Sequence, residues 1–161
     1  MILVWKKIKV YAIAIAIPLA VGGLSAFLSR GGMDAYQLVI QPPLSPPMWL
    51  FPVVWSLLYI LMGIGSGIVW LRRENDPEAT LSALIVYGFQ LVVNFFWSII
   101  FFNMQAFLFA FIWLALLWLL IIAMIVKFSR ISRAAAWLQV PYLLWVTFAG
   151  YLTLMVWLLN R

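Results

Sequence analysis

The side chains of this sequence that could act on a ligand are aromatic rings and uncharged amides, because the usual catalytic groups are absent. There is no cysteine and no histidine, which excludes thiolate nucleophiles, thiolate metal sites and imidazole bases. The carboxylates all lie between the apolar runs, at Asp34, Glu74, Asp76 and Glu78. The sequence therefore offers few side chains for conventional acid–base or nucleophilic catalysis.

The spacing of the rings and amides puts them on shared faces of predicted helices. Trp55 and Tyr59 are one helical turn apart. Two further sets have helical spacing: Gln90, Asn94, Trp97 and Phe101, and then Trp145, Ala149 and Leu152. An uncharged pocket with aromatic walls and a few amides suits a flat, largely apolar ligand. Two interpretations of Gln90 and Asn94 stay open: they line such a cavity, or they hydrogen-bond helices to one another.

The composition shows that lipid surrounds most of the elements that carry these residues. Hydrophobic residues make up 68% of the chain and charged residues only 9%, whereas a soluble domain carries about 25% charged residues. So few charges cannot cover a water-exposed surface. A proton-coupled transporter or pump usually keeps an ionisable residue inside the membrane, and none is expected mid-span here.

The uncharged runs predict an all-α integral membrane protein, a single domain over residues 1–161 with five transmembrane helices. A span needs about 20 mostly apolar residues. The runs give spans at about 10–28, 47–71, 80–102, 106–126 and 134–159. The uncharged stretch 79–126 is long enough for two spans, and Asn103–Gln105 is its most polar point, so a tight hairpin is predicted there. Pro141 predicts a kink in the last span.

The basic residues predict the orientation of the bundle. Those at the N-terminus and in the second and fourth loops are Lys6, Lys7, Lys9, Arg72, Arg73, Lys127, Arg130 and Arg133. Only Arg30 and Arg161 lie at the other end. Positive loops face the cytoplasm, so we expect a cytoplasmic N-terminus. The first loop, about 29–46, then faces outward and is long enough to act as a lid.

Three motifs stand out in the second, third and fifth spans. The second span contains Pro46-Pro47, Trp49, Pro52, Trp55, Leu58-Tyr59, Met62-Gly63, Gly65-Ser66 and Trp70. The third contains Gln90-Leu91, Asn94, Trp97 and Phe101-Phe102, and the fifth contains Pro141-Tyr142-Leu143, Trp145, Phe148 and Asn160. In this order and spacing they resemble the translocator protein/tryptophan-rich sensory protein (TspO/MBR) family, and the resemblance covers roughly residues 10–160.

The resemblance implies a homodimeric five-helix bundle whose pocket is closed by the first loop and binds porphyrins such as protoporphyrin IX, with no obligatory cofactor and no metal. Carried over by position, the ligand-binding residues are Tyr36, Trp49, Trp55, Tyr59, Gln90, Asn94, Trp145, Phe148 and Ala149. Some bacterial members degrade the porphyrin in light, and Trp55 and Trp145 match the tryptophans on which that reaction depends. They would be the catalytic residues only if this chemistry occurs.

Some positions depart from the family pattern. The lysine and tryptophan usual in the first loop are replaced within Gln41–Pro47, which leaves Arg30 as the substitute contact for a ligand carboxylate. Trp113 stands where an aspartate is common. Thr153, Leu154 and Leu158 replace residues of the cholesterol motif of animal members, so weak or no specific cholesterol binding is expected.

The leading functional hypothesis is a receptor-like membrane protein that binds porphyrins and senses, shuttles or degrades tetrapyrroles. The alternatives are a light-dependent porphyrin-degrading enzyme, a passive transporter of porphyrins or lipids, and a structural protein whose aromatic residues merely pack. Membrane lipid and a flat hydrophobic ligand are the expected partners. Nucleic acid is not, because the positive charges lie between apolar runs. A bacterial inner membrane is the expected location.

Overall fold

The computed structural model describes residues 1–161, and every regular element in it is a helix. Five of its helical segments are long and apolar enough to cross a membrane. The elements are α1 (Ile2–Tyr36), α2 (Leu50–Leu71), α3 (Pro77–Ser98), the π-helical turn η1 (Ile99–Asn103), α4 (Phe107–Ile131), α5 (Arg133–Trp137) and α6 (Val140–Leu159). The predicted all-α, five-span architecture is confirmed.

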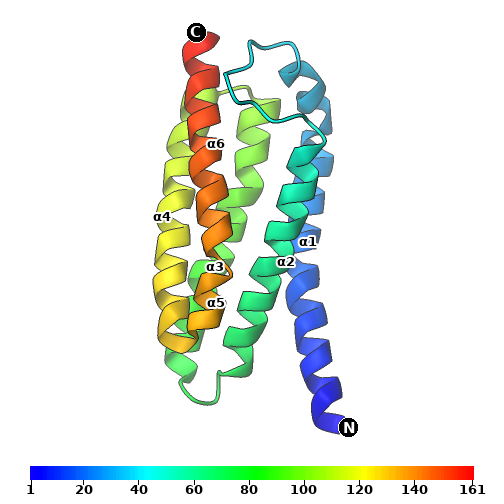
Figure 1. Cartoon of the computed structure of the whole chain (residues 1–161), viewed down its shortest axis with the longest axis vertical. Coiled ribbons are helices and arrows are strands. Elements are labelled where there is room, and N and C mark those ends of the chain that lie inside the picture. Colours follow the sequence, from blue (N-terminus) through cyan, green and yellow to red (C-terminus); the bar gives the residue numbers. More distant parts are fainter.

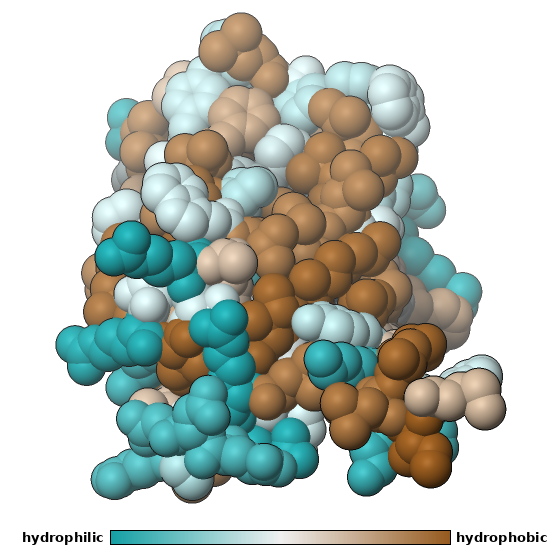
Figure 2. Space-filling model, turned by 60° about the horizontal axis from the view of Figure 1, so that its bottom comes forward, coloured by the Kyte–Doolittle hydropathy of each residue, from teal (hydrophilic) through white to brown (hydrophobic).

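The spans run along one common axis, with the two termini at opposite ends of the bundle (Figure 1). The N-terminus shares its end with the α2–α3 connection and the α4–α5 turn. The C-terminus lies at the other end, beside the connection between α1 and α2. Hydrophilic side chains gather at the N-terminal end, next to an apolar surface (Figure 2).

Local sequence signals explain where α3 and α5 begin. The Asp76 carboxylate caps α3 by accepting a hydrogen bond from the Ala79 amide at 2.9 Å. Pro77 and Glu78 follow it in the first turn, where a missing N–H and a negative charge are both favourable. Ser132 caps α5 in the same way, through the Ala135 amide at 3.3 Å.

The first helix is longer at both ends than the predicted span 10–28. It continues through the charged residues Lys6, Arg30 and Asp34, because a charged residue ends the apolar run without ending the helix. The connection to α2 is therefore residues 37–49 rather than 29–46. Its backbone includes Leu44 at φ 69°, and we call this segment the first loop below.

The hairpin predicted at Asn103–Gln105 is present. The π-helical turn η1 ends at Asn103, and Gln105 takes the left-handed conformation with φ 49°. The interruption predicted at Pro141 lies slightly earlier, at Leu138–Gln139, between α5 and α6. Pro141 sits in the first turn of α6, where its missing N–H is tolerated, so it helps to begin a helix rather than bending one.

Close contact between α1 and α2 depends on glycine. A Cβ on Gly63 would collide with the backbone of Ala14 and Ile15, and one on Gly67 would lie 2.8 Å from the Tyr11 ring. Gly63 and Gly67 therefore serve helix packing, as small residues at this spacing commonly do.

Candidate functional site

An aromatic cavity of about 240 Å³ lies in the half of the bundle next to the first loop. Helices α1, α2, α3 and α6 form its walls, and the first loop and η1 each contribute a side chain. None of the lining residues is charged: they are Gly22, Ala26, Met33, Met48, Phe51, Pro52, Trp55, Tyr59, Trp97, Ser98, Phe102, Trp145 and Ala149.

Two tryptophans from different helices line this cavity. Trp55 of α2 stacks on Tyr59 with ring centroids 5.6 Å apart and meets the edge of Tyr142 at 6.1 Å. Trp145 of α6 makes an edge contact with Phe51 at 5.9 Å. The two rings predicted to contact a ligand are thus brought together by helix packing, although they are far apart in the sequence.

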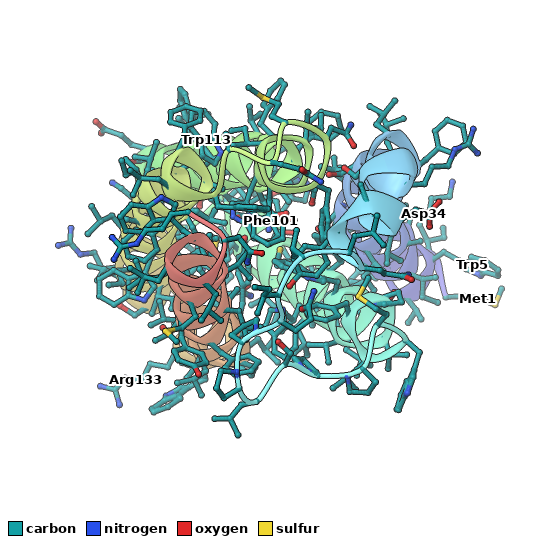
Figure 3. All side chains as sticks on the ribbon, turned by 90° about the horizontal axis from the view of Figure 1, so that it is seen from above. Met1, Trp5, Asp34, Phe101, Trp113 and Arg133 are labelled. Atoms are coloured by element: carbon teal, nitrogen blue, oxygen red, sulfur yellow. The ribbon has the colours of Figure 1, made fainter.

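Two indole N–H groups at the cavity have no hydrogen-bond partner within the protein. They belong to Trp97 and Trp145, and both nitrogen atoms are buried. A buried donor without an acceptor costs about 1–3 kcal/mol, and a bound molecule with an acceptor atom would remove that cost. The Trp97 ring is fixed by Phe101, which stacks on it at 5.1 Å and 18°. Phe101 occupies the centre of the bundle when it is seen from above (Figure 3).

A buried hydrogen-bond network lies beneath the cavity. The Tyr59 hydroxyl donates to Asn94 Oδ1 at 3.0 Å. Asn94 Nδ2 donates to the Tyr142 hydroxyl at 2.6 Å, which donates to Gln90 Oε1 at 2.7 Å. Gln90 and Asn94 are not among the lining residues. Of the two interpretations left open by the sequence, the structure shows the one in which these amides join helices, here α2, α3 and α6.

The other predicted site residues lie around the cavity rather than in its wall. Tyr36 is buried against Phe101 and Phe102 and lines a small extension of about 20 Å³, which Ala149 also lines. Trp49 is 67% exposed. Phe148 packs beside Trp145 at 5.6 Å and lines an outer groove between α2 and α6 instead.

Arg30, the residue expected to contact a ligand carboxylate, is not part of the cavity wall. Its guanidinium lies 4.2 Å from the centroid of the Phe27 ring. Phe27 is 56% exposed, and neither residue lines the cavity. Arg30 lies one turn from Ala26 and Met33 on the same side of α1, so its expected contact with a ligand carboxylate stays a prediction.

Several lining residues were not singled out in the sequence, and α1 supplies three of them. Gly22, Ala26 and Met33 share one face of that helix. A Cβ on Gly22 would collide with the Tyr59 ring, so this glycine makes room for the cavity floor. The small residues Gly22 and Ala26, one turn apart, are the sequence signal that could have indicated this face.

The first loop is held over the cavity end by the C-terminus. Asn160 Oδ1 accepts from the Ile40 amide at 2.8 Å, and Asn160 Nδ2 donates to the Ile40 carbonyl at 3.0 Å. The Tyr151 hydroxyl donates to the Pro43 carbonyl at 3.0 Å. Met48, near the end of this loop, lines the cavity, so movement of the loop would change the volume of the cavity.

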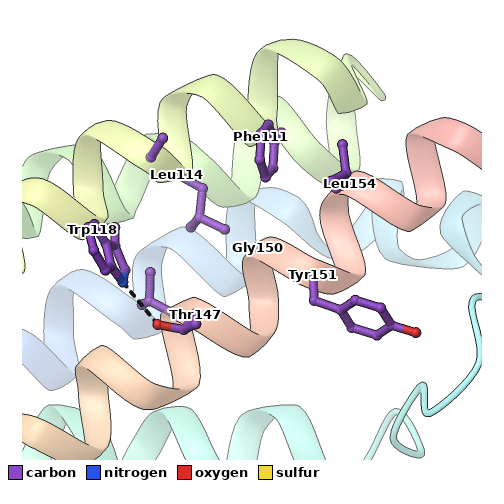
Figure 4. Close-up of a pocket in the computed structure, with 9 residues that line it drawn as sticks. Phe111, Leu114, Trp118, Thr147, Gly150, Tyr151 and Leu154 are labelled. Carbon is purple, nitrogen blue, oxygen red and sulfur yellow. Dashed lines mark hydrogen bonds between the residues drawn. The ribbon is translucent and has the colours of Figure 1, made fainter.

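A separate groove of about 250 Å³ runs along the outside of the bundle between α4 and α6. Trp118 Nε1 donates to Thr147 Oγ1 across it at 2.9 Å. The Tyr151 side chain extends away from α4, toward the first loop (Figure 4). The Tyr151 hydroxyl is thus already used by the first loop.

The sequence is similar to known proteins of one family. Residues 14–158 match the sequence profile of the TspO/MBR family. The chain is 36% identical to the tryptophan-rich protein TspO of Chlorobaculum tepidum, over 96% of this chain and 98% of that protein. It is 39% identical to protein CrtK of Rhodobacter capsulatus, over 94% and 91% of the two chains. It is also 33% identical to the translocator protein of Bos taurus, over 87% and 83%.

Proposed function

Because this chain belongs to the TspO/MBR family, we propose that it is a receptor-like membrane protein that binds porphyrins of the protoporphyrin IX type in its aromatic cavity. The observation that carries the proposal is the pair Trp55 and Trp145, which line one uncharged cavity from two helices. A flat macrocycle would gain both ring stacking and apolar burial between such walls.

The unpaired donors of the cavity favour a ligand that carries acceptor atoms. The indole N–H groups of Trp97 and Trp145 are buried, so an acceptor atom of the macrocycle would reach them only once the cavity has widened. Since no lining residue is charged, full burial of a carboxylate would be costly. We therefore expect the propionate groups to point toward the first loop and water, with the apolar edge of the macrocycle innermost.

Binding of a macrocycle would require the cavity to widen. Its volume of about 240 Å³ lies below the range of about 300–1,000 Å³ typical of ligand pockets. Met48 and Phe51 line both the cavity and the small extension beside Tyr36. Rotation of these two side chains, together with a shift of the first loop, would join the two spaces.

The role of binding is proposed to be tetrapyrrole sensing, shuttling or degradation. The names of two similar proteins, a translocator protein and a tryptophan-rich sensory protein, point to transport and to sensing. Light-dependent porphyrin degradation at Trp55 and Trp145, and passive transport, are the alternatives. We further propose that the N-terminus lies in the cytoplasm, on the basis of the positive charges at that end. The homodimer and the bacterial inner membrane are proposed from the family resemblance alone.

The test is a titration of the purified protein with protoporphyrin IX, followed by porphyrin absorbance in the dark. Trp55→Phe and Trp145→Phe should each weaken binding about two- to tenfold, which corresponds to the loss of one aromatic contact. Trp137→Phe is the matched control, because Trp137 is 71% exposed. Absence of saturable binding, or equal weakening by all three variants, would contradict the proposal.

The same samples separate binding from catalysis. Under illumination, conversion of the bound porphyrin to a new absorbing product that is lost in Trp55→Phe and Trp145→Phe would identify an enzyme. Unchanged absorbance of the bound porphyrin under illumination would indicate that the protein binds the porphyrin without degrading it. Porphyrin-loaded proteoliposomes would show protein-dependent release only for a transporter.

A further inference from the structure

A second, larger hollow lies in the opposite half of the bundle, near the N-terminus. It has a volume of about 470 Å³ and runs between α1 and α3, with α2 behind it. We call it the α1–α3 groove. It shares no residue with the aromatic cavity, and its lining includes Val10, Ile13, Ser66, Trp70, Tyr87 and Leu91. Ile13 is 61% exposed and Trp70 45% exposed, so the groove opens to the lipid.

The walls of the groove are almost entirely apolar. Its two hydroxyl-bearing side chains, Ser66 and Tyr87, are both buried and lie beside each other. The Ser66 hydroxyl donates to the Gly63 carbonyl at 3.0 Å, and the Tyr87 ring is fixed from behind by Phe128, 6.2 Å away. The surface that remains open suits an acyl chain.

The end of the groove nearest the N-terminus carries positive charge. Lys6 lies one turn before Val10 on the same face of α1. On α2, the Arg73 guanidinium lies 4.7 Å from the centroid of the Trp70 ring. Its one acidic neighbour, the exposed Glu74 carboxylate, is 3.9 Å away, which leaves N–H donors free. Hydrophilic side chains gather around this end of the bundle (Figure 2).

We propose that the α1–α3 groove is a binding site for an anionic phospholipid. One acyl chain lies along the apolar walls of α1 and α3. The phosphate lies between Lys6 and Arg73. Basic pockets between transmembrane helices attract anionic headgroups in this way.

A second copy of the chain fits the groove less well than a lipid does. A two-fold interface brings the same surface patch of both copies together. The second copy would add its own Lys6 and Arg73 to this interface, and like charges repel each other. An anionic lipid instead neutralises these two charges.

The experiment is native mass spectrometry of the intact protein in detergent, titrated with phosphatidylglycerol or with phosphatidylcholine that carries the same acyl chains. Preferential retention of phosphatidylglycerol is expected. Lys6→Gln and Arg73→Gln should each reduce that preference about fivefold, the value of one charge near a headgroup.

Arg130→Gln is the matched control, because it removes one exposed positive charge from the same end of the bundle but from α4, outside the groove. It should leave the preference unchanged. Equal retention of both lipids, or an equal effect of Arg130→Gln and Arg73→Gln, would overturn the proposal. So would efficient disulfide cross-linking between copies through Ile13→Cys in bilayers, since the groove would then be covered by a second copy. The natural chain contains no cysteine, so any such cross-link reports on residue 13 alone.

Discussion

Asn94 Nδ2 and the Tyr142 hydroxyl, 2.6 Å apart, join α3 to α6 directly beneath the aromatic cavity. The same hydroxyl donates to Gln90 Oε1 at 2.7 Å, and Asn94 Oδ1 accepts from Tyr59. Tyr142 and Gln90 are completely buried. One phenol oxygen thus links two amides of α3, and through Asn94 it also orients Tyr59, which stacks on Trp55.

Tyr142→Phe should therefore destabilise the protein without changing the shape of its core. The substitution leaves Asn94 Nδ2 and Gln90 Oε1 without their partner, at a cost of about 1–2 kcal/mol in a membrane interior. Thermal unfolding in detergent should show a lower Tm. Tyr11→Phe is the control, because the Tyr11 hydroxyl makes no hydrogen bond with another residue. Equal Tm values for the two variants would contradict a stabilising network.

Asn160→Ala should free the first loop from the end of α6. It removes both hydrogen bonds to Ile40, at 2.8 and 3.0 Å. The Ile40 amide should then exchange its hydrogen about tenfold faster, which corresponds to the loss of about 1.4 kcal/mol of local stability. Hydrogen–deuterium exchange measures this rate. Asn75→Ala, at the opposite end of the bundle, should leave it unchanged, and unchanged exchange in Asn160→Ala would show that other contacts hold the loop.

Adjacent glycines of α1 should respond in opposite directions to alanine. A Cβ on Gly22 would overlap the Tyr59 ring, whereas one on Gly23 meets nothing within 4 Å. Tyr59 is held by its bond to Asn94, so Gly22→Ala should destabilise the protein by about 1–3 kcal/mol. Gly23→Ala should be neutral or stabilising, by up to about 1 kcal/mol, because alanine favours the helix. Similar Tm values for both variants would mean that the Tyr59 ring can move aside at little cost in stability.

The sequence predicts the number of helices well because uncharged runs are directly visible, and Asn103–Gln105 divides the longest of them. It predicts the ends of α1 poorly, since Lys6 and Arg30 end the apolar run but not the helix. The pairing of Trp55 with Trp145 followed from the family resemblance. The contributions of Met33, Met48 and Phe51 depend on how α1, the first loop and α2 pack against one another, and helix periodicity contains no information on that.

Ala149→Leu should block the cavity while leaving both of its tryptophans unchanged. Ala149 lines both the cavity and the small extension beside Tyr36 and is only 7% exposed. A leucine there fills empty space, so the Tm should stay the same or rise, as contacts are gained with the walls. Protoporphyrin IX binding should fall at least about tenfold, since each 1.4 kcal/mol of lost contact is tenfold in affinity. Ala134→Leu, at an exposed position of α5, is the control and should bind normally. Because Trp55 and Trp145 remain in place, unchanged binding in Ala149→Leu would show that the porphyrin lies elsewhere, even if the tryptophan variants are impaired.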